Sequence, residues 1–188
     1  GLIGKKIGMT QIFDQEGNII PVTAIKIEKN IVTALKNTQK HGYSAIQVGF
    51  GDQKEKHITK AQATFFKKNN LPIKRVLMEF RLTPDEVAKY QIGQEIPLTA
   101  FETEKAVDIT GITKGRGFAG VIKRYKFSGF PGSHGTHEYF RHPGSIGCRT
   151  DPGRVMKNKR LPGHYGTERV TIQNLKIVKI DQENNVLL

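Results

Sequence analysis

The sequence has few features that would crosslink the chain, anchor it in a membrane or export it. Cys148 is the only cysteine among 188 residues, so no internal disulfide framework is possible and a reducing compartment is indicated. No apolar run approaches the roughly 20 residues that a membrane-spanning helix needs. The first four residues show no secretory signal and are typical of a mature or trimmed terminus. We therefore predict no membrane partner.

Acidic residues are also scarce. The chain has 17 Asp and Glu against 30 Lys and Arg, which gives a formal net charge of +13. This excess favours a polyanionic partner, but charge alone does not distinguish RNA, DNA and an anionic membrane. Hydrophobic residues make up 37% of the chain, which allows one or two small domains with a modest core.

The first half of the chain is typical of β structure. We predict a hairpin of strands 7–13 and 19–27 around the turn residues 14–18. Helices are predicted within 54–70, with Thr59 as the N-cap and Ala61, Phe65 and Phe66 on one face, and from Thr83-Pro84 onwards. Further strands are predicted at 31–35, 43–50, 75–82, 95–101, 106–112, 170–180 and 186–188. Many short strands predict an all-β barrel or sandwich, with residues 53–101 as a small α+β insertion.

Residues 112–169, called the basic segment below, differ in composition from the rest. They contain twelve Lys and Arg against three Asp and Glu, or +9 of the net +13, and more than half of the 20 glycines. Such a segment cannot bury enough apolar surface to offset its ordering entropy, so we expect it to be mobile alone and ordered against nucleic acid. Its seven interleaved aromatic residues can stack on unpaired bases. The alternatives are a solvated basic loop or, at Lys157-Asn158-Lys159-Arg160, a localisation patch.

Two patterns in the basic segment suggest other chemistry. Residues 115–120 match GxGxxG, but alternating strand and helix units are missing, and Glu138 is the only acid near the ribose-binding position. We favour a turn whose amides, with Lys114 and Arg116, meet phosphates.

Four histidines (His134, His137, His142 and His164) and Cys148 could bind zinc, but structural zinc sites usually have paired cysteines. A nucleophilic Cys148 is disfavoured because acids are sparse nearby. We therefore predict no metal, no cofactor, no catalytic residue and no small-molecule substrate.

Several blocks of sequence, in order, resemble the bacterial form of the ribosomal large-subunit protein three family. Residues 1–13 (GLIGKKIGMTQIF) resemble the opening of that family, and residues 21–23 and 42–47 resemble its next blocks. Residues 107–111 and 114–124 resemble its most specific signature. Ser133-His134-Gly135 and residues 142–147, 152–155 and 163–166 follow in family order. The match covers nearly the whole chain, and the ordered blocks together are far more specific than any one motif.

The resemblance implies a mainly β fold with a translation-protein-type β-barrel, a small α+β insertion and a long basic glycine-rich extension. The expected parts are a barrel core at 1–52, 102–112 and 168–188, an insertion at 53–101 and an rRNA-binding arm at 113–167. It also implies a structural constituent of the large subunit in a cytoplasmic or organellar ribosome, and not an enzyme. The arm would bind 23S-type rRNA, support early subunit assembly and reach toward the peptidyl transferase centre. The expected neighbours are large-subunit proteins fourteen and nineteen.

The predicted RNA-contacting residues are Lys, Arg and His side chains of the N-terminal region and of the basic segment. They are Lys5, Lys6, Lys114, Arg116, Lys123, Arg124, Lys126, His134, Arg141, His142, Arg149, Arg154, Lys157, Lys159, Arg160, His164 and Arg169.

Some bacterial relatives carry a methylated glutamine just before the Pro-Gly pair that corresponds to Pro152-Gly153. Here Cys148-Arg149-Thr150-Asp151 contains no glutamine, so that modification is not expected. Relatives usually continue past residues 186–188. Two other functions are considered as alternatives to rRNA binding. One is a metal- or cofactor-dependent enzyme. The other is a DNA-binding architectural protein, for which the sequence shows no recognition-helix pattern.

Overall fold

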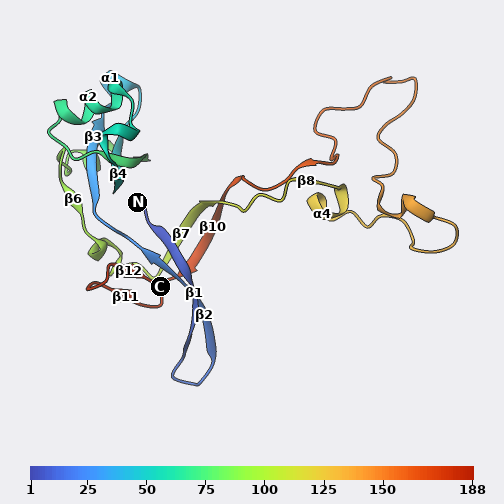
Figure 1. Cartoon of the computed structure of the whole chain (residues 1–188), viewed down its shortest axis with the longest axis horizontal. Coiled ribbons are helices and arrows are strands. Elements are labelled where there is room, and N and C mark those ends of the chain that lie inside the picture. Colours follow the sequence, from blue (N-terminus) through green and yellow to red (C-terminus); the bar gives the residue numbers. More distant parts are fainter. The chain divides into compact units, whose positions relative to one another are not determined.

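A computed structural model describes residues 1–188, which divide into two compact units. Unit 1 comprises Gly1–Val107 and Lys176–Leu188, and unit 2 comprises Asp108–Leu175. The elements of unit 1 are β1 (Lys5–Phe13), β2 (Ile19–Lys26), β3 (Asn30–Lys36), α1 (Thr38–His41), β4 (Ala45–Asp52), η1 (Glu55–His57), α2 (Lys60–Lys68), β5 (Lys74–Arg81), α3 (Pro84–Val87), β6 (Glu95–Ile96), η2 (Leu98–Phe101), β11 (Ile180–Asp181) and β12 (Val186–Leu187) (Figure 1). Unit 2 holds most of β7 (Ala106–Ile112) and β10 (Arg169–Lys176), together with β8 (Phe118–Ala119), α4 (Val121–Tyr125), η3 (His137–Arg141) and β9 (Gly163–His164).

The predicted N-terminal hairpin is confirmed. β1 and β2 pair antiparallel, with Phe13 opposite Ile19 at the tip. The turn is closed by a backbone hydrogen bond from the Gly17 amide to the Asp14 carbonyl (2.9 Å). Gly17 has a φ of +81°, a conformation that a residue without a Cβ adopts at little cost. The turn chemistry therefore explains the register of the pair.

The sheets are antiparallel, and the mainly β class is confirmed. β12 pairs with β2, and β11 pairs with β12, so one sheet of order β1-β2-β12-β11 joins the two chain ends. A second sheet has the order β5-β4-β3-β6, and β7 pairs with β10 in a third. No sheet closes on itself, so the predicted barrel is not confirmed. Closure would require the outer strands of one sheet to pair, but β11 has only two residues and β10 pairs with β7 alone.

The core of unit 1 consists of two clusters. Ile46, Val48 and Val87 are buried in the first, between the β5-β4-β3-β6 sheet and α3. Leu98 and Leu187 belong to the second, which packs the chain ends together. Leu98 lies where a strand over 95–101 was predicted, and that prediction is wrong beyond Ile96. Pro97 has no amide hydrogen to donate to a ladder, and the 3-10 helix η2 follows it and buries Leu98.

The helix starts follow their capping residues. The predicted N-cap Thr59 is confirmed, because its hydroxyl accepts from the Gln62 amide (3.4 Å) and the Gln62 side chain accepts from the Thr59 amide (3.3 Å). Of the predicted apolar face of α2, Phe66 is buried, Phe65 is half-buried and Ala61 is exposed. The start at Thr83-Pro84 is also confirmed, although α3 spans only one turn.

A buried asparagine holds the N-terminus in place. Asn30 is fully buried at the start of β3. Its side chain accepts from the Ile3 amide (2.9 Å) and donates to the carbonyls of Ile3 (3.1 Å) and Glu28 (2.8 Å). Satisfying these backbone groups matters because an unpaired buried donor or acceptor costs about 1–3 kcal/mol. The contact fixes Ile3 inside the first core cluster.

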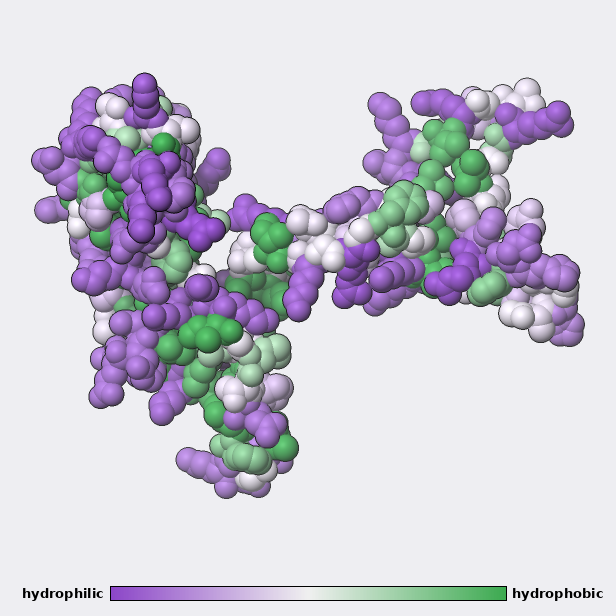
Figure 2. Space-filling model, viewed as in Figure 1, coloured by the Kyte–Doolittle hydropathy of each residue, from purple (hydrophilic) through white to green (hydrophobic).

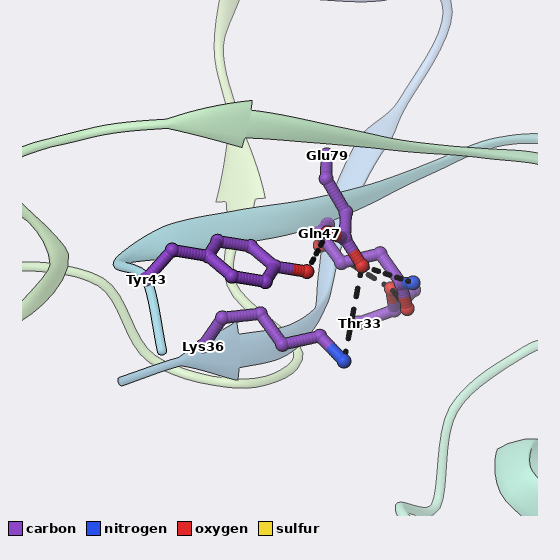
Figure 3. A network of polar contacts seen from close by, with 5 residues as sticks. All are labelled: Thr33, Lys36, Tyr43, Gln47 and Glu79. Carbon is purple, nitrogen blue, oxygen red and sulfur yellow. Dashed lines mark hydrogen bonds and ion pairs between the residues drawn. The ribbon is translucent and has the colours of Figure 1, made fainter. Parts of the chain in front are cut away.

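A polar network links β3, β4 and β5 (Figure 3). The Tyr43 hydroxyl donates to Glu79 (2.6 Å), Gln47 donates to the same carboxylate (3.4 Å), and the Lys36 ammonium lies 3.8 Å from it. The hydrogen bond to Glu79, followed by partial desolvation and the carboxylate charge, raises the pKa of Tyr43 above its ordinary value of 10.0, while Arg81 opposes the shift. The sequence pattern gave no sign of this network.

Replacing Glu79 with Gln should therefore lower the pKa of Tyr43 toward 10.0. Because the folded pKa of Tyr43 is raised, its stabilising contribution is present below pH 10.0 and is lost as the pH rises through the folded value. Tyrosinate absorbance, titrated in wild type and E79Q, measures the difference. E95Q, which removes an acid that pairs with Lys29, is the matched control. Identical titrations of wild type and E79Q would contradict this assignment.

Candidate nucleic-acid interface

The basic segment begins and ends in a short backbone ladder. The Thr113 amide donates to the Glu168 carbonyl (3.0 Å), and the Arg116 amide donates to the Tyr165 carbonyl (2.8 Å). β8 then pairs with β9, with Phe118 opposite His164. The Arg116 amide inside the GxGxxG match is therefore already bonded. This one amide of the turn is thus engaged within the protein, whereas the Arg116 side chain stays exposed.

Helix α4 (Val121–Tyr125) follows the ladder. Val121 is buried at its first turn. Arg124 reaches across to donate to the Leu161 carbonyl (3.0 Å), so it joins the two halves of the basic segment. The helix ends at Lys126, which has left-handed backbone (φ 59°), and its amide donates to the Ile122 carbonyl (2.9 Å). Beyond this point η3 is the only regular element up to β9.

The structure exposes nearly all of the predicted RNA-contacting residues. Lys5 and Lys6 lie on β1 in unit 1, and the others lie in unit 2. Arg124 alone is half-buried, whereas the remaining cations and the three predicted histidines are exposed. The exposed members in unit 2 are Lys114, Arg116, Lys123, Lys126, His134, Arg141, His142, Arg149, Arg154, Lys157, Lys159, Arg160, His164 and Arg169.

None of the Lys and Arg side chains in the basic segment lies within 4.0 Å of a carboxylate oxygen. All five ion pairs of the chain are in unit 1: Lys26–Glu28, Lys29–Glu95, Lys36–Glu79, Lys67–Glu55 and Lys74–Asp52. Three arginines of the segment instead lie over aromatic rings. The guanidinium carbons of Arg124 and Arg160 are 5.0 and 5.7 Å from the Tyr125 ring centre, and that of Arg116 is 5.6 Å from the ring centre of Tyr165. The segment's net +9 therefore has no internal ionic partner.

Aromatic and basic residues meet in one pocket of about 510 Å³ within unit 2. It is lined by Tyr125, Lys126, Phe127, Ser128, Gly129, Phe130, His142, Pro143 and Arg160. Lys126, His142 and Arg160 are among the predicted RNA-contacting residues. Tyr125, Phe127 and Phe130 belong to the seven aromatic residues that the sequence led us to expect on unpaired bases. That they share one pocket with these cations was not predicted. In Figure 2 the surface of unit 2 shows apolar areas between hydrophilic ones.

The histidines and the cysteine do not gather. No three His, Cys, Asp or Glu side chains are placed to hold one metal ion. The His142 ring lies 4.7 Å from the Tyr139 ring, and the His164 ring contacts the Thr167 hydroxyl (3.2 Å). Cys148 is exposed.

None of the helices combines the length and the apolar character that spanning a bilayer requires.

These features define a class: basic, mainly β proteins with a large unpaired cationic surface. The family model described as ribosomal protein L3 matches residues 86–186. The large ribosomal subunit proteins uL3 of Myxococcus xanthus and Endomicrobium trichonymphae are 51% and 50% identical to the chain. Both alignments cover the whole chain and, respectively, 84% and 81% of the relative. That of Brachyspira hyodysenteriae is 46% identical, with 85% of the relative covered.

The chain belongs to the ribosomal protein L3 family, in its bacterial type. Family membership makes it a structural constituent of the large ribosomal subunit in the cytoplasm, and not an enzyme. There it associates with large-subunit rRNA and ribosomal proteins.

Replacing Gly166 with Ala should open the ladder at the start of the basic segment. Gly166 has a φ of +83°, and a Cβ there would lie 2.2 Å from the Lys114 carbonyl oxygen. The strained backbone alone costs about 1–3 kcal/mol, so the amides of Arg116 and Tyr165 should exchange hydrogen roughly tenfold faster or more. Gly132→Ala is the matched control, because a Cβ at Gly132 meets nothing within 4 Å. Equal exchange in both variants would show that Gly166 does not hold the ladder.

Proposed function

We propose that the chain binds 23S-type rRNA chiefly through its basic segment, supports early assembly of the large subunit and extends an arm toward the peptidyl transferase centre. The observation that carries this proposal is the set of twelve cations without an ion pair in residues 112–169. Phosphates of a folded RNA supply the missing anions. Each cation that neutralises a phosphate releases condensed counterions, and this release drives binding.

The proposal assigns contact roles to residues outside the segment as well. Lys5 and Lys6 are exposed at the start of β1 and have no ion pair, so they are available to a phosphate. In the basic segment the cations share the surface with exposed rings such as Phe118 and Tyr139, which are 79% and 59% exposed. Rings in such positions are suited to unpaired bases, which RNA offers far more often than duplex DNA does.

The arrangement of domains is part of the proposal. The β1-β2-β12-β11 sheet joins strands from the two chain ends, which supports a core to which both ends contribute. The proposed barrel core comprises residues 1–52, 102–112 and 168–188. Residues 53–101 are the proposed inserted domain, whose strands β5 and β6 pair with β4 and β3, and residues 113–167 are the proposed rRNA-binding arm. The large-subunit proteins fourteen and nineteen are the proposed neighbours.

Neutralising three arm cations should flatten the salt dependence of rRNA binding. Lys157, Lys159 and Arg160 are exposed and unpaired, so K157A/K159A/R160A removes up to three phosphate contacts. The slope of log K against log salt should become less steep by about 2–3, since each contact contributes about 0.7–0.9. Fluorescence anisotropy with a large-subunit rRNA fragment across a salt series measures the slope.

The control variant is K54A/K56A/K60A, which removes three exposed lysines of unit 1 that form no ion pair. It makes the same change in net charge outside the basic segment. We expect its slope to stay close to that of the wild type. An equal slope for the arm variant and the wild type would reject the segment as the main contact surface.

A further inference from the structure

One wall of the pocket in unit 2 is built by the chain reversal at the end of α4. Lys126 takes left-handed backbone there, which brings the rings of Tyr125 and Phe127 to 6.3 Å between centres, tilted by 45°. Neither ring is fully buried, and both line the pocket. The guanidinium groups of Arg124 and Arg160 lie over the Tyr125 ring, so a flat ligand can stack on the Phe127 ring or on a guanidinium plane.

The opposite wall is held by a backbone contact. The Phe130 amide donates to the Phe140 carbonyl (2.9 Å), and this contact brings the chain that carries His142 and Pro143 to the pocket. A side chain at Gly129 would lie 2.4 Å from that same carbonyl oxygen. Gly129 therefore allows the two stretches to meet, and Phe130 lies at the rim with 47% of its surface exposed. The contact between Phe130 and Phe140 thus holds this side of the open pocket in place.

The charge of the pocket is positive and unpaired. Arg160 lines it with its guanidinium carbon 5.7 Å from the Tyr125 ring centre, and Lys126 lines it beside that ring. Neither cation forms an ion pair, and no acidic residue lines the pocket. A purely apolar ligand would leave these cations unused. A ligand that combines a flat ring with an anion satisfies both the rings and the cations.

We propose that this pocket holds a single unpaired nucleotide of the RNA, with its base against the aromatic wall and its phosphate on Arg160 and Lys126. The inference rests on the proposed function, because the rest of the RNA chain lies along the basic segment on either side. A volume of about 510 Å³ is within the ordinary range for ligand pockets. Unpaired bases stack on aromatic rings and guanidinium planes, whereas bases within a duplex cannot enter such a pocket.

The test replaces two rings and compares two RNAs. F127L/F130L keeps apolar bulk but removes two aromatic faces. The probes are a hairpin RNA with an unpaired loop and a fully paired RNA duplex of the same length. Affinity for the hairpin should fall about 5- to 150-fold, which corresponds to the loss of base stacking. Affinity for the duplex and the salt slope should not change, because phosphate contacts determine both.

F127Y/F130Y is the conservative control, since it keeps both ring faces and should retain affinity for the hairpin. The inference is overturned if F127L/F130L binds the hairpin as well as the wild type does, if it loses equal affinity for both RNAs, or if F127Y/F130Y is as weak as F127L/F130L. Failure of the proposed function has a different result, in which the wild type binds neither RNA with a steep salt slope.

Discussion

Twelve lysine and arginine side chains share residues 112–169 with only three carboxylates, and none of the twelve forms an ion pair within the protein. Like charges at this density repel one another and oppose a compact state. The segment has few buried apolar side chains to offset that repulsion, with Ala119 and Val121 the main ones. Its local order comes instead from backbone ladders, glycines at close approaches and guanidinium groups over rings. Polyanion binding is the interaction that such a surface favours.

The two units differ in how their charged groups are paired. Both apolar clusters lie in unit 1, where a buried Asn30 and five ion pairs satisfy polar and charged groups within the protein. Even the buried Lys74 is paired there, 2.7 Å from Asp52. Unit 2 leaves its cations to an external partner. Membership of the ribosomal protein L3 family identifies that setting as the large ribosomal subunit.

Local signals in the sequence predicted much of the fold. The turn residues 14–18 predicted the β1–β2 hairpin, and Thr59 and Thr83 predicted helix starts, because turns and caps depend on neighbouring residues. The strand over 95–101 failed because Pro97 and the burial of Leu98 outweighed its apolar pattern. Barrel closure could not be read from strand patterns, since it depends on which distant edges pair.

For the candidate site, composition identified the cations but not their arrangement. The pocket combines residues 125–130 with residues 142–143 and Arg160, and only the folded chain brings these together. The hydrogen bond from Arg124 to the Leu161 carbonyl likewise joins residues that are far apart in the sequence. By contrast, the excess of Lys and Arg and the ordered family motifs are properties of the sequence itself. They were sufficient to predict the family, which the comparisons confirm.

The most direct measurement is the chemical reactivity of the lysines in the free protein and in the assembled large subunit. Acetylation followed by mass spectrometry reports on Lys114, Lys123, Lys126, Lys157 and Lys159, all of which are exposed in the chain. We predict that these lysines react in the free protein and become protected in the subunit, because rRNA phosphates bind their ammonium groups there. Equal reactivity in both states would contradict the claim that the unpaired cations of the basic segment bind rRNA.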